Sequence, residues 1–247
     1  MNTFYSQQGE DIYIYKNFIN KEVNDGIFVE LGAMDGICYS NTKFFEDTLK
    51  FTGILIEPTI QYNNLIINRP KCDCYNVAIN NTSGKVKFLG SHATAGMVYT
   101  MSENFRKGWH KDNSNEYYVD SEPINNICKK SNISYIDLMT IDVEGGEQVV
   151  LETIDFNIPI YIICIELDNH NIDKDNNCRK ILKKNGFILK KRLTINEFWI
   201  NENYYRKSLL YDDSKSFIYT NSSIRELGYF PFLENHLILE IEDSLKD

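Results

Sequence analysis

The chain has 247 residues, of which 43% are hydrophobic and 25% charged, as in an ordinary globular protein. This length fits one large domain, and it allows a buried core without disulfide staples. The formal net charge of −9 argues against a duplex nucleic-acid binder, which usually carries a basic surplus. The short basic run at 190–192 is interpreted as the solvated edge of a strand.

Cysteine usage and the absence of leader-like segments indicate where the protein works. None of the six cysteines forms a C-x-x-C pair, so reduced thiols in a cytoplasmic setting are the simplest interpretation. The N-terminus has no basic region followed by an apolar core, so no signal peptide is expected. The longest apolar run is roughly half of the ~20 residues that span a bilayer, so no membrane span is predicted.

Buried strands alternate with helices along the first 90 residues. Apolar spacing predicts helices over 11–20, 40–49 and 59–68, and apolar runs predict strands over 26–32, 52–58, 72–79 and 84–90. Residues 90–122 are polar and aromatic, and their pattern predicts no regular element.

The second half continues the alternation. Strands are predicted at 135–142 and 160–167, helices at 147–155 and 175–186, and a closing hairpin at 187–193 and 196–204. This order predicts an α/β fold with a mostly parallel sheet and helices on both faces. We expect a single domain over 1–247, with the segment 207–247 docked on it as an extension.

The stretch "FVELGAMDG" at 28–36 has the pattern of a strand running into a tight turn. Its glycines, Gly32 and Gly36, have G-x-x-x-G spacing and no third glycine follows, which disfavours a dinucleotide pyrophosphate and hence an NAD-type oxidoreductase. Glu57 ends the next strand about twenty residues later, where an acid accepts hydrogen bonds from ribose hydroxyls. The acids beside the turn suit a ligand that carries a positive charge and no phosphate. S-adenosylmethionine, which has a ribose and a sulfonium, fits these requirements. The alternative for Glu57 is a solvated acid before a proline turn.

Acids and a histidine follow the later strands. Asp142 and Glu144 lie in "TIDVEGGE" and could act as general base, as acceptors for substrate hydroxyls, as metal ligands or as helix caps. "IELDNH" ends the next strand and adds Asp168 and His170 at the same predicted edge. Either Asp142 or His170 could remove a proton from an acceptor, with Glu144 beside them. A divalent metal on Asp142, Glu144 and Asp168 is the less favoured alternative, and no metal site is predicted.

Aromatic and histidine residues are the candidates for contact with an acceptor. His92 and Trp109 lie in the unassigned region, and Trp199 lies in the last predicted strand. These residue types often cradle a sugar ring; the alternative is a surface flap with ordinary packing aromatics.

The chain resembles the FkbM-type methyltransferases that use S-adenosylmethionine. Six ordered stretches carry the resemblance: "SQQGED" at 6–11, "FVELGAMDGICYSNT" at 28–42, "GILIEP" at 53–58, "YNVAI" at 75–79, "IDLMTIDVEGGEQVVLETIDF" at 136–156 and "IYIICIELDNH" at 160–170. "NEFWINENY" at 196–204 also resembles the family's closing strand region. The resemblance implies a Rossmann-like sheet of seven strands with the last one antiparallel. It also implies that residues 1–20 cover the cofactor, and that the cofactor is held by Gln8, Glu30, Gly32, Gly36, Asn41, Glu57, Ala78 and Asp142.

The same resemblance implies O-methylation of a sugar or natural product. We expect a hydroxyl of a deoxyhexose such as rhamnose, within a glycan, to be the acceptor. Two alternatives stay open: a non-sugar small molecule as acceptor, or a non-catalytic cofactor-binding partner of a glycosyltransferase.

Overall fold

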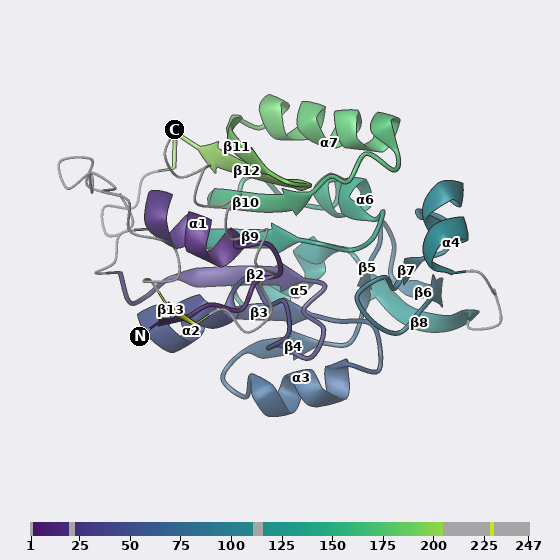
Figure 1. Cartoon of the computed structure of the whole chain (residues 1–247), viewed down its shortest axis with the longest axis horizontal. Helices are drawn as coiled ribbons and strands as arrows, with labels where there is room; N and C mark the ends of the chain where they lie inside the picture. Colours follow the sequence, from purple (N-terminus) through teal and green to yellow (C-terminus); the bar gives the residue numbers. More distant parts are fainter. Residues whose placement is uncertain (1, 20–22, 111–115, 205–227, 230–247) are drawn as a thin grey trace.

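A central sheet of seven strands organises the computed structural model, which describes residues 2–19, 23–110, 116–204 and 228–229. Its strand order is β11-β12-β10-β9-β2-β3-β4 (Figure 1). All neighbours from β10 to β4 are parallel, whereas β12 runs antiparallel to both β10 and β11. The bounds are β2 (Ile27–Leu31), β3 (Thr52–Ile56), β4 (Asp73–Tyr75), β9 (Ile136–Ile141), β10 (Ile160–Glu166), β11 (Phe187–Leu193) and β12 (Asn196–Asn201). The predicted sheet, including its antiparallel strand, is confirmed.

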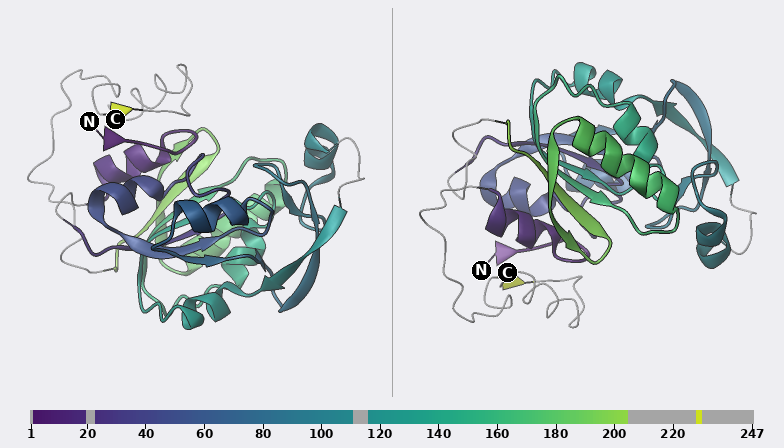
Figure 2. Two further views of the ribbon diagram at one scale, coloured as in Figure 1. Left: turned by 90° about the horizontal axis from the view of Figure 1, so that it is seen from below. Right: turned by 90° about the horizontal axis from the view of Figure 1, so that it is seen from above.

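Helices cover both faces of this sheet (Figure 2). Along β10, Ile162 and Cys164 join one core while Ile163 and Ile165 join the other, because successive strand residues point to opposite faces. The first core is covered by α1 (Glu10–Asn17), α2 (Lys43–Leu49) and α3 (Tyr62–Asn68). The second is covered by α5 (Ile124–Lys130), α6 (Glu147–Glu152) and α7 (Ile172–Lys184).

A second sheet is the main departure from the predicted fold. It has the order β5-β8-β6-β7, with bounds β5 (Ala78–Ile79), β6 (Gly84–Leu89), β7 (Gly96–Met97) and β8 (Glu116–Glu122), and it carries α4 (Glu103–Trp109). These elements lie together beyond one end of the central strands (Figure 1). The unassigned region 90–122 therefore supplies β7, α4 and the whole of β8.

The strand predicted over 72–79 is divided between the two sheets. Residues 76–77 separate the two parts, and the side-chain amide of Asn76 donates to the backbone oxygen of Glu57 at 2.8 Å. Residues before Asn76 form β4 beside β3, and residues after it form β5 beside β8. The segment that was predicted as one long strand thus connects the central sheet to the second sheet.

Several smaller expectations can also be compared with the structure. All six cysteines are unpaired. In the parts of the chain that are described, no helix is long and apolar enough to cross a membrane. The basic run lies on the edge strand β11, where Lys190 pairs with Glu202. The expected docking of 207–247 lies outside the described residues, except that β13 (Gly228–Tyr229) pairs in parallel with β1 (Asn2–Thr3).

Candidate functional site

A cavity of about 360 Å³ opens between the carboxyl ends of the central strands and the second sheet. The residues that follow β2, β3, β9 and β10 form one wall, and residues of β6, β7 and α4 form the other. Open α/β sheets bind ligands at this edge. Most of the predicted site residues line this one cavity: Gln8, Glu30, Gly32, Asn41, Glu57, Ala78, His92, Trp109, Asp142, Glu144, Asp168 and His170.

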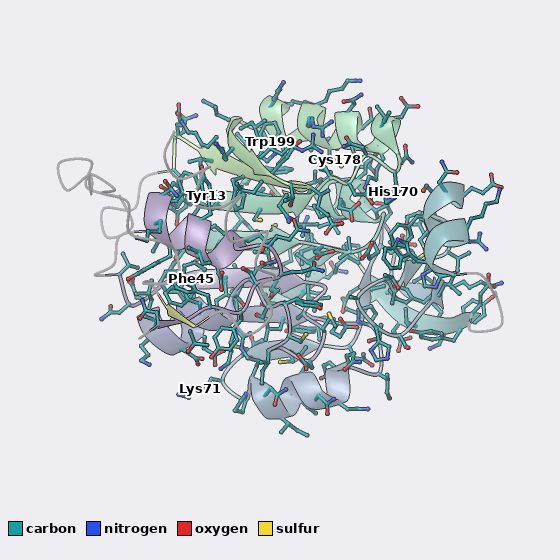
Figure 3. The ribbon with its side chains drawn as sticks, in the orientation of Figure 1. Tyr13, Phe45, Lys71, His170, Cys178 and Trp199 are labelled. Carbon is teal, nitrogen blue, oxygen red and sulfur yellow. The ribbon has the colours of Figure 1, made fainter. Side chains whose placement is uncertain are left out.

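Two predicted site residues do not line the cavity. Trp199 is fully buried in the core beneath α7, where its indole N–H donates to Glu197 at 3.1 Å, so the expected contact with substrate is wrong (Figure 3). The strand alternation decides this: Trp199 points to the face opposite the neighbouring Phe198. Gly36 shapes the turn with φ of 79°, but it packs against α3 and Arg69 rather than against the cavity.

Gly32 is required by the close approach of two strands. A Cβ atom built on it would lie 1.9 Å from the carbonyl oxygen of Asp142, and its φ of 82° is in the left-handed region. The amide N–H groups of Gly32 and Ala33 both donate to the carbonyl of Ile56, at 3.0 and 3.1 Å. The turn is thereby fixed between β3 and β9, and Asp142 lies next to it.

Glu57 is held rigidly at the cavity wall. Its Oε2 accepts from the amide of Met34 at 2.9 Å, and its Oε1 accepts from the amide of Thr59 at 2.7 Å. Burial raises the pKa of this carboxyl, while the hydrogen bonds from Thr59 and Met34 oppose that rise. Each carboxylate oxygen can accept more than one hydrogen bond, so capacity for a ligand's hydroxyl groups remains.

Glu30 lines the cavity but its carboxylate serves the protein itself. Oε1 accepts from the amide of Asn41 at 2.7 Å, and Oε2 accepts from the hydroxyls of Ser40 and Thr42. Asn41 is consequently held between two clamped neighbours. Its side-chain Oδ1 is buried and has no hydrogen-bond partner in the structure, which is costly unless a ligand donates to it.

Gln8 connects the N-terminal segment to the end of the sheet. Its side-chain oxygen accepts from the hydroxyl of Thr194 and from the amide of Asn196, the latter at 3.2 Å. Asn196 also donates to Glu10. The segment before α1 is therefore fixed against the β11–β12 turn, at the rim of the cavity.

Four carboxyl groups gather where β9 and β10 end: Asp142, Glu144, Glu166 and Asp168. Burial, followed by the negative charge of Glu147 and other acids, raises the pKa of Asp142 to about 7, and a hydrogen bond with Glu166 opposes the rise. Burial and the charge of Asp142 raise the pKa of Glu144 to about 9. The same two causes raise the pKa of Glu166 well above its ordinary range. At neutral pH some members of this group therefore carry protons, and Asp142 titrates near pH 7.

His170 is oriented by Asp168. The ring Nδ1 bonds to Oδ2 of Asp168, and the His170 amide donates to Oδ1 of the same carboxylate at 2.9 Å. With Nδ1–H donating, Nε2 is the nitrogen that can accept a proton. The ring also packs edge-on against Phe105 of α4, with ring centroids 5.4 Å apart. His170 thus connects the two walls of the cavity.

Metal-holding geometry is not found around these acids. Among the residues that the structure describes, no group of three or more His, Cys, Asp or Glu side chains could hold a metal ion.

A family model for the methyltransferase FkbM domain matches residues 30–189. The chain belongs to the FkbM methyltransferase family. The match covers the turn at Gly32, Glu57 and the acids after β9 and β10, and it includes the whole second sheet. No sequence among curated proteins matches the chain significantly.

Solved structures similar to this FkbM-family chain are distant in sequence. An FkbM methyltransferase from Methylobacillus flagellatus KT is 13% identical with a TM-score of 0.46, covering 72% of this chain and 44% of its own. A fibrillarin from Aeropyrum pernix, solved with natively bound S-adenosyl-L-methionine, is 12% identical (TM-score 0.42, 79% and 73% covered). TrmK from M. capricolum, in complex with S-adenosyl-homocysteine, is 12% identical (0.40, 95% and 81%). This chain thus spans under half of the Methylobacillus protein's length.

Sequence reasoning missed several residues in and around the candidate site of this FkbM-family chain. Met34 has φ of 48°, and its amide reaches Glu57 from between the two glycines. Phe105 lies in the region without periodicity, so no local signal placed it beside His170. Arg69 lies outside the cavity, at the end of α3, and only the folded chain brings it behind the Gly36–Thr42 loop.

Proposed function

We propose that the protein transfers a methyl group from S-adenosylmethionine to a sugar hydroxyl, such as that of a deoxyhexose in a glycan. The observation that carries the proposal is that Glu57, Asn41 and the candidate bases Asp142 and His170 line one cavity at the ligand edge of the sheet. A cytoplasmic location is part of the proposal, supported by the six unpaired thiols.

The residues of the cavity fit S-adenosylmethionine. Glu57 would accept hydrogen bonds from the two ribose hydroxyls. Backbone amides fix both of its carboxylate oxygens in position for this. The buried Oδ1 of Asn41 would accept from the ammonium group at the amino-acid end. When bound, S-adenosylmethionine supplies an electrophilic methyl carbon whose bond to sulfur breaks, with the electron pair left on sulfur.

The chain's own contribution to the chemistry is to align the acceptor and remove its proton. The acceptor oxygen forms the new bond to carbon, and its proton passes to Asp142 or to Nε2 of His170. The pKa of Asp142, raised by burial and neighbouring acids to about 7, suits a general base at neutral pH. His170, held by Asp168, offers the same chemistry 28 positions further along the chain.

A sugar acceptor is supported by the wall that α4 contributes. Trp109 lines the cavity although 62% of its surface is exposed, so it offers an aromatic face at the entrance. His92, bonded to Gln61 at 2.7 Å, lines the same cavity with polar ring nitrogens. Apolar faces combined with polar edges match a sugar ring.

Two measurements test this function. Calorimetry compares S-adenosylmethionine with NAD; binding of NAD alone would overturn the proposal. Transfer of labelled methyl groups to a panel of mono- and oligosaccharides, with non-sugar alcohols as controls, then identifies the acceptor. Cofactor affinity without any methylated product would favour the non-catalytic alternative, a cofactor-binding partner of a glycosyltransferase.

N-methylation is a second candidate, favoured by the charge of the cavity. Six acids line it, namely Glu30, Glu57, Asp142, Glu144, Glu166 and Asp168, whereas no Lys or Arg occurs among its described lining residues. Those of the six acids that stay ionised attract a cationic amine and repel phosphate. An amino sugar and its parent sugar, compared as acceptors, separate the two reactions, because only the amino sugar can yield an N-methyl product.

A further inference from the structure

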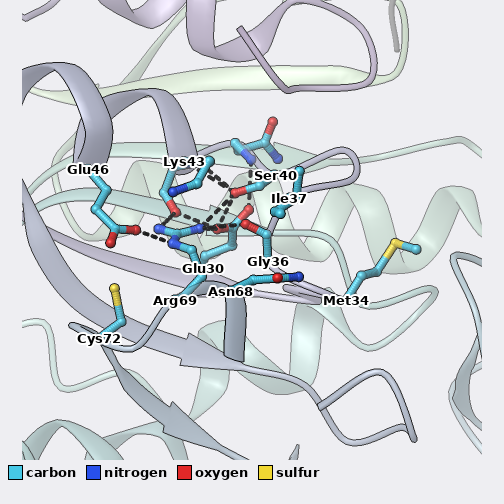
Figure 4. Close-up of polar contacts among 12 residues, drawn as sticks. Glu30, Met34, Gly36, Ile37, Ser40, Lys43, Glu46, Asn68, Arg69 and Cys72 are labelled. Atoms are coloured by element: carbon cyan, nitrogen blue, oxygen red, sulfur yellow. Dashed lines mark hydrogen bonds and ion pairs between the residues drawn. The ribbon is translucent and has the colours of Figure 1, made fainter. Parts of the chain in front are cut away.

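Among the residues that the structure describes, Arg69 is the largest charged side chain that is fully buried, and it does not line the cavity. It follows the last turn of α3 and lies behind the loop that connects Gly36 to α2 (Figure 4). Its guanidinium is stacked over Phe28 of β2, with Cζ 5.3 Å from the ring centroid. Burying a guanidinium is costly unless its donors are satisfied, so each of its contacts is informative.

The guanidinium bonds to the loop at three separated points. Nη1 donates to the carbonyl of Gly36 at 3.0 Å and to the hydroxyl of Ser40 at 3.1 Å, and Nη2 donates to the hydroxyl of Thr42 at 3.1 Å. Nε forms an ion pair with Glu46 of α2 (Figure 4). One planar group therefore holds the start, the middle and the end of the loop.

The same two hydroxyls continue to Glu30. Ser40 and Thr42 each accept from Arg69 and donate to Oε2 of Glu30. Nη1 lies 3.8 Å from that oxygen, so the charges also attract directly. Oε1 of Glu30 is then left to accept from the amide of Asn41 at 2.7 Å.

Asn41 brings an unpartnered polar atom from this network to the cavity. It lies between Ser40 and Thr42, its backbone is held by Glu30, and its side chain lines the cavity with Oδ1 buried and unpartnered. A buried acceptor with no donor points to a missing ligand group. The acceptor's position depends on the loop, and the loop's position depends on Arg69.

We infer that Arg69 is a positioning residue for the cofactor, acting through Asn41 without touching the ligand. The inference rests on the proposed binding of S-adenosylmethionine. It implies that the fork geometry of arginine matters as well as its charge, since a lysine has no planar fork to span Gly36, Ser40 and Thr42 together.

A double-mutant cycle with S-adenosylmethionine as the probe tests this. We expect Arg69→Lys and Asn41→Ala each to weaken binding about tenfold or more, the scale of one lost charge-assisted hydrogen bond. Because both changes remove the same contact, the double variant should bind about as weakly as either single variant. Turnover at saturating cofactor should fall much less than affinity does.

Matched controls separate positioning from general loss of structure. Arg179→Lys changes another arginine paired with a buried acid, Glu197, on the opposite side of the sheet, and it should leave affinity unchanged. Should Arg69→Lys fail to fold, Thr42→Val removes one link of the same network at similar volume and enters the same cycle with Asn41→Ala. Wild-type affinity in a folded Arg69→Lys or Thr42→Val variant, or additive effects with Asn41→Ala, would overturn the inference. Failure of the wild-type protein to bind S-adenosylmethionine would instead overturn the proposed function.

Discussion

Replacing Glu57 by glutamine tests the ribose contact most directly, because it removes the charge and nearly preserves the shape. The two oxygens of Glu57 face two amide donors, from Met34 at 2.9 Å and Thr59 at 2.7 Å. In either orientation of the glutamine amide, its NH₂ group, a donor, faces one of these N–H donors and loses that hydrogen bond. The remaining oxygen is neutral and accepts more weakly.

The expected loss follows from the bonds that the ligand makes. A hydrogen bond to a charged group contributes about 1.5–3 kcal/mol, so Glu57→Gln should weaken cofactor binding roughly 10- to 150-fold. Calorimetry with S-adenosylhomocysteine measures this change. An analogue without ribose hydroxyls should bind the variant and the wild-type protein about equally.

The control is Glu122→Gln. Glu122 also lies at the end of a strand, β8, but it pairs with the surface residue Lys130 and does not line the cavity. It should leave affinity unchanged. If Glu57→Gln is folded, as judged by its thermal transition, and still binds like the wild-type protein, Glu57 is not the ribose acceptor.

Three further predictions concern the acids and the core. Asp142→Asn should lower kcat by a factor of ~10²–10⁴ with little change in cofactor affinity. The kcat of the wild-type protein should rise as pH increases through about 7, where Asp142 loses its proton and can act as the base. Full activity of the Asp142→Asn variant would leave His170 as the base. Glu144 keeps its proton up to about pH 9 in the folded protein but loses it near 4.5 when unfolded, so its contribution to stability falls as pH rises between these values. Glu144→Gln should therefore stabilise the ligand-free protein by about 1–3 kcal/mol at pH 8 and hardly at pH 5, measured by denaturant unfolding; equal effects at both pH values would contradict the raised pKa. Trp199→Ala should destabilise the fold by about 3–5 kcal/mol, and a folded variant with impaired acceptor binding alone would restore the substrate role that burial argues against.

The local pattern of the sequence was sufficient to predict the central sheet. Strands such as 136–141 and 160–166 are apolar on both faces, as strands of a covered parallel sheet must be, and each is followed by polar residues at its carboxyl end. Since parallel strands end at one edge, Glu57, Asp142 and His170 could be placed together before the structure was known. The glycine spacing at Gly32 likewise disfavoured a pyrophosphate turn.

Tertiary structure alone decided what lies opposite that edge. Residues 90–122 show no clear period, since β7 has only two residues, α4 has seven, and β8 carries three acidic residues among its seven. The positions of Phe105 and Trp109 follow from pairing between distant segments, which local pattern does not encode.

Trp199 and Arg69 both show that local sequence pattern does not determine which way a side chain faces or what it contacts in the folded protein. From the sequence, an aromatic residue within this strand could face either side of the sheet, and the strand alternation placed Trp199 in the core. Arg69 had no motif of its own, yet its guanidinium reaches a loop 27 to 33 residues away and fixes it. Sequence determined which chemical groups reach the ligand edge; packing decided which of them face the ligand and which hold those that do.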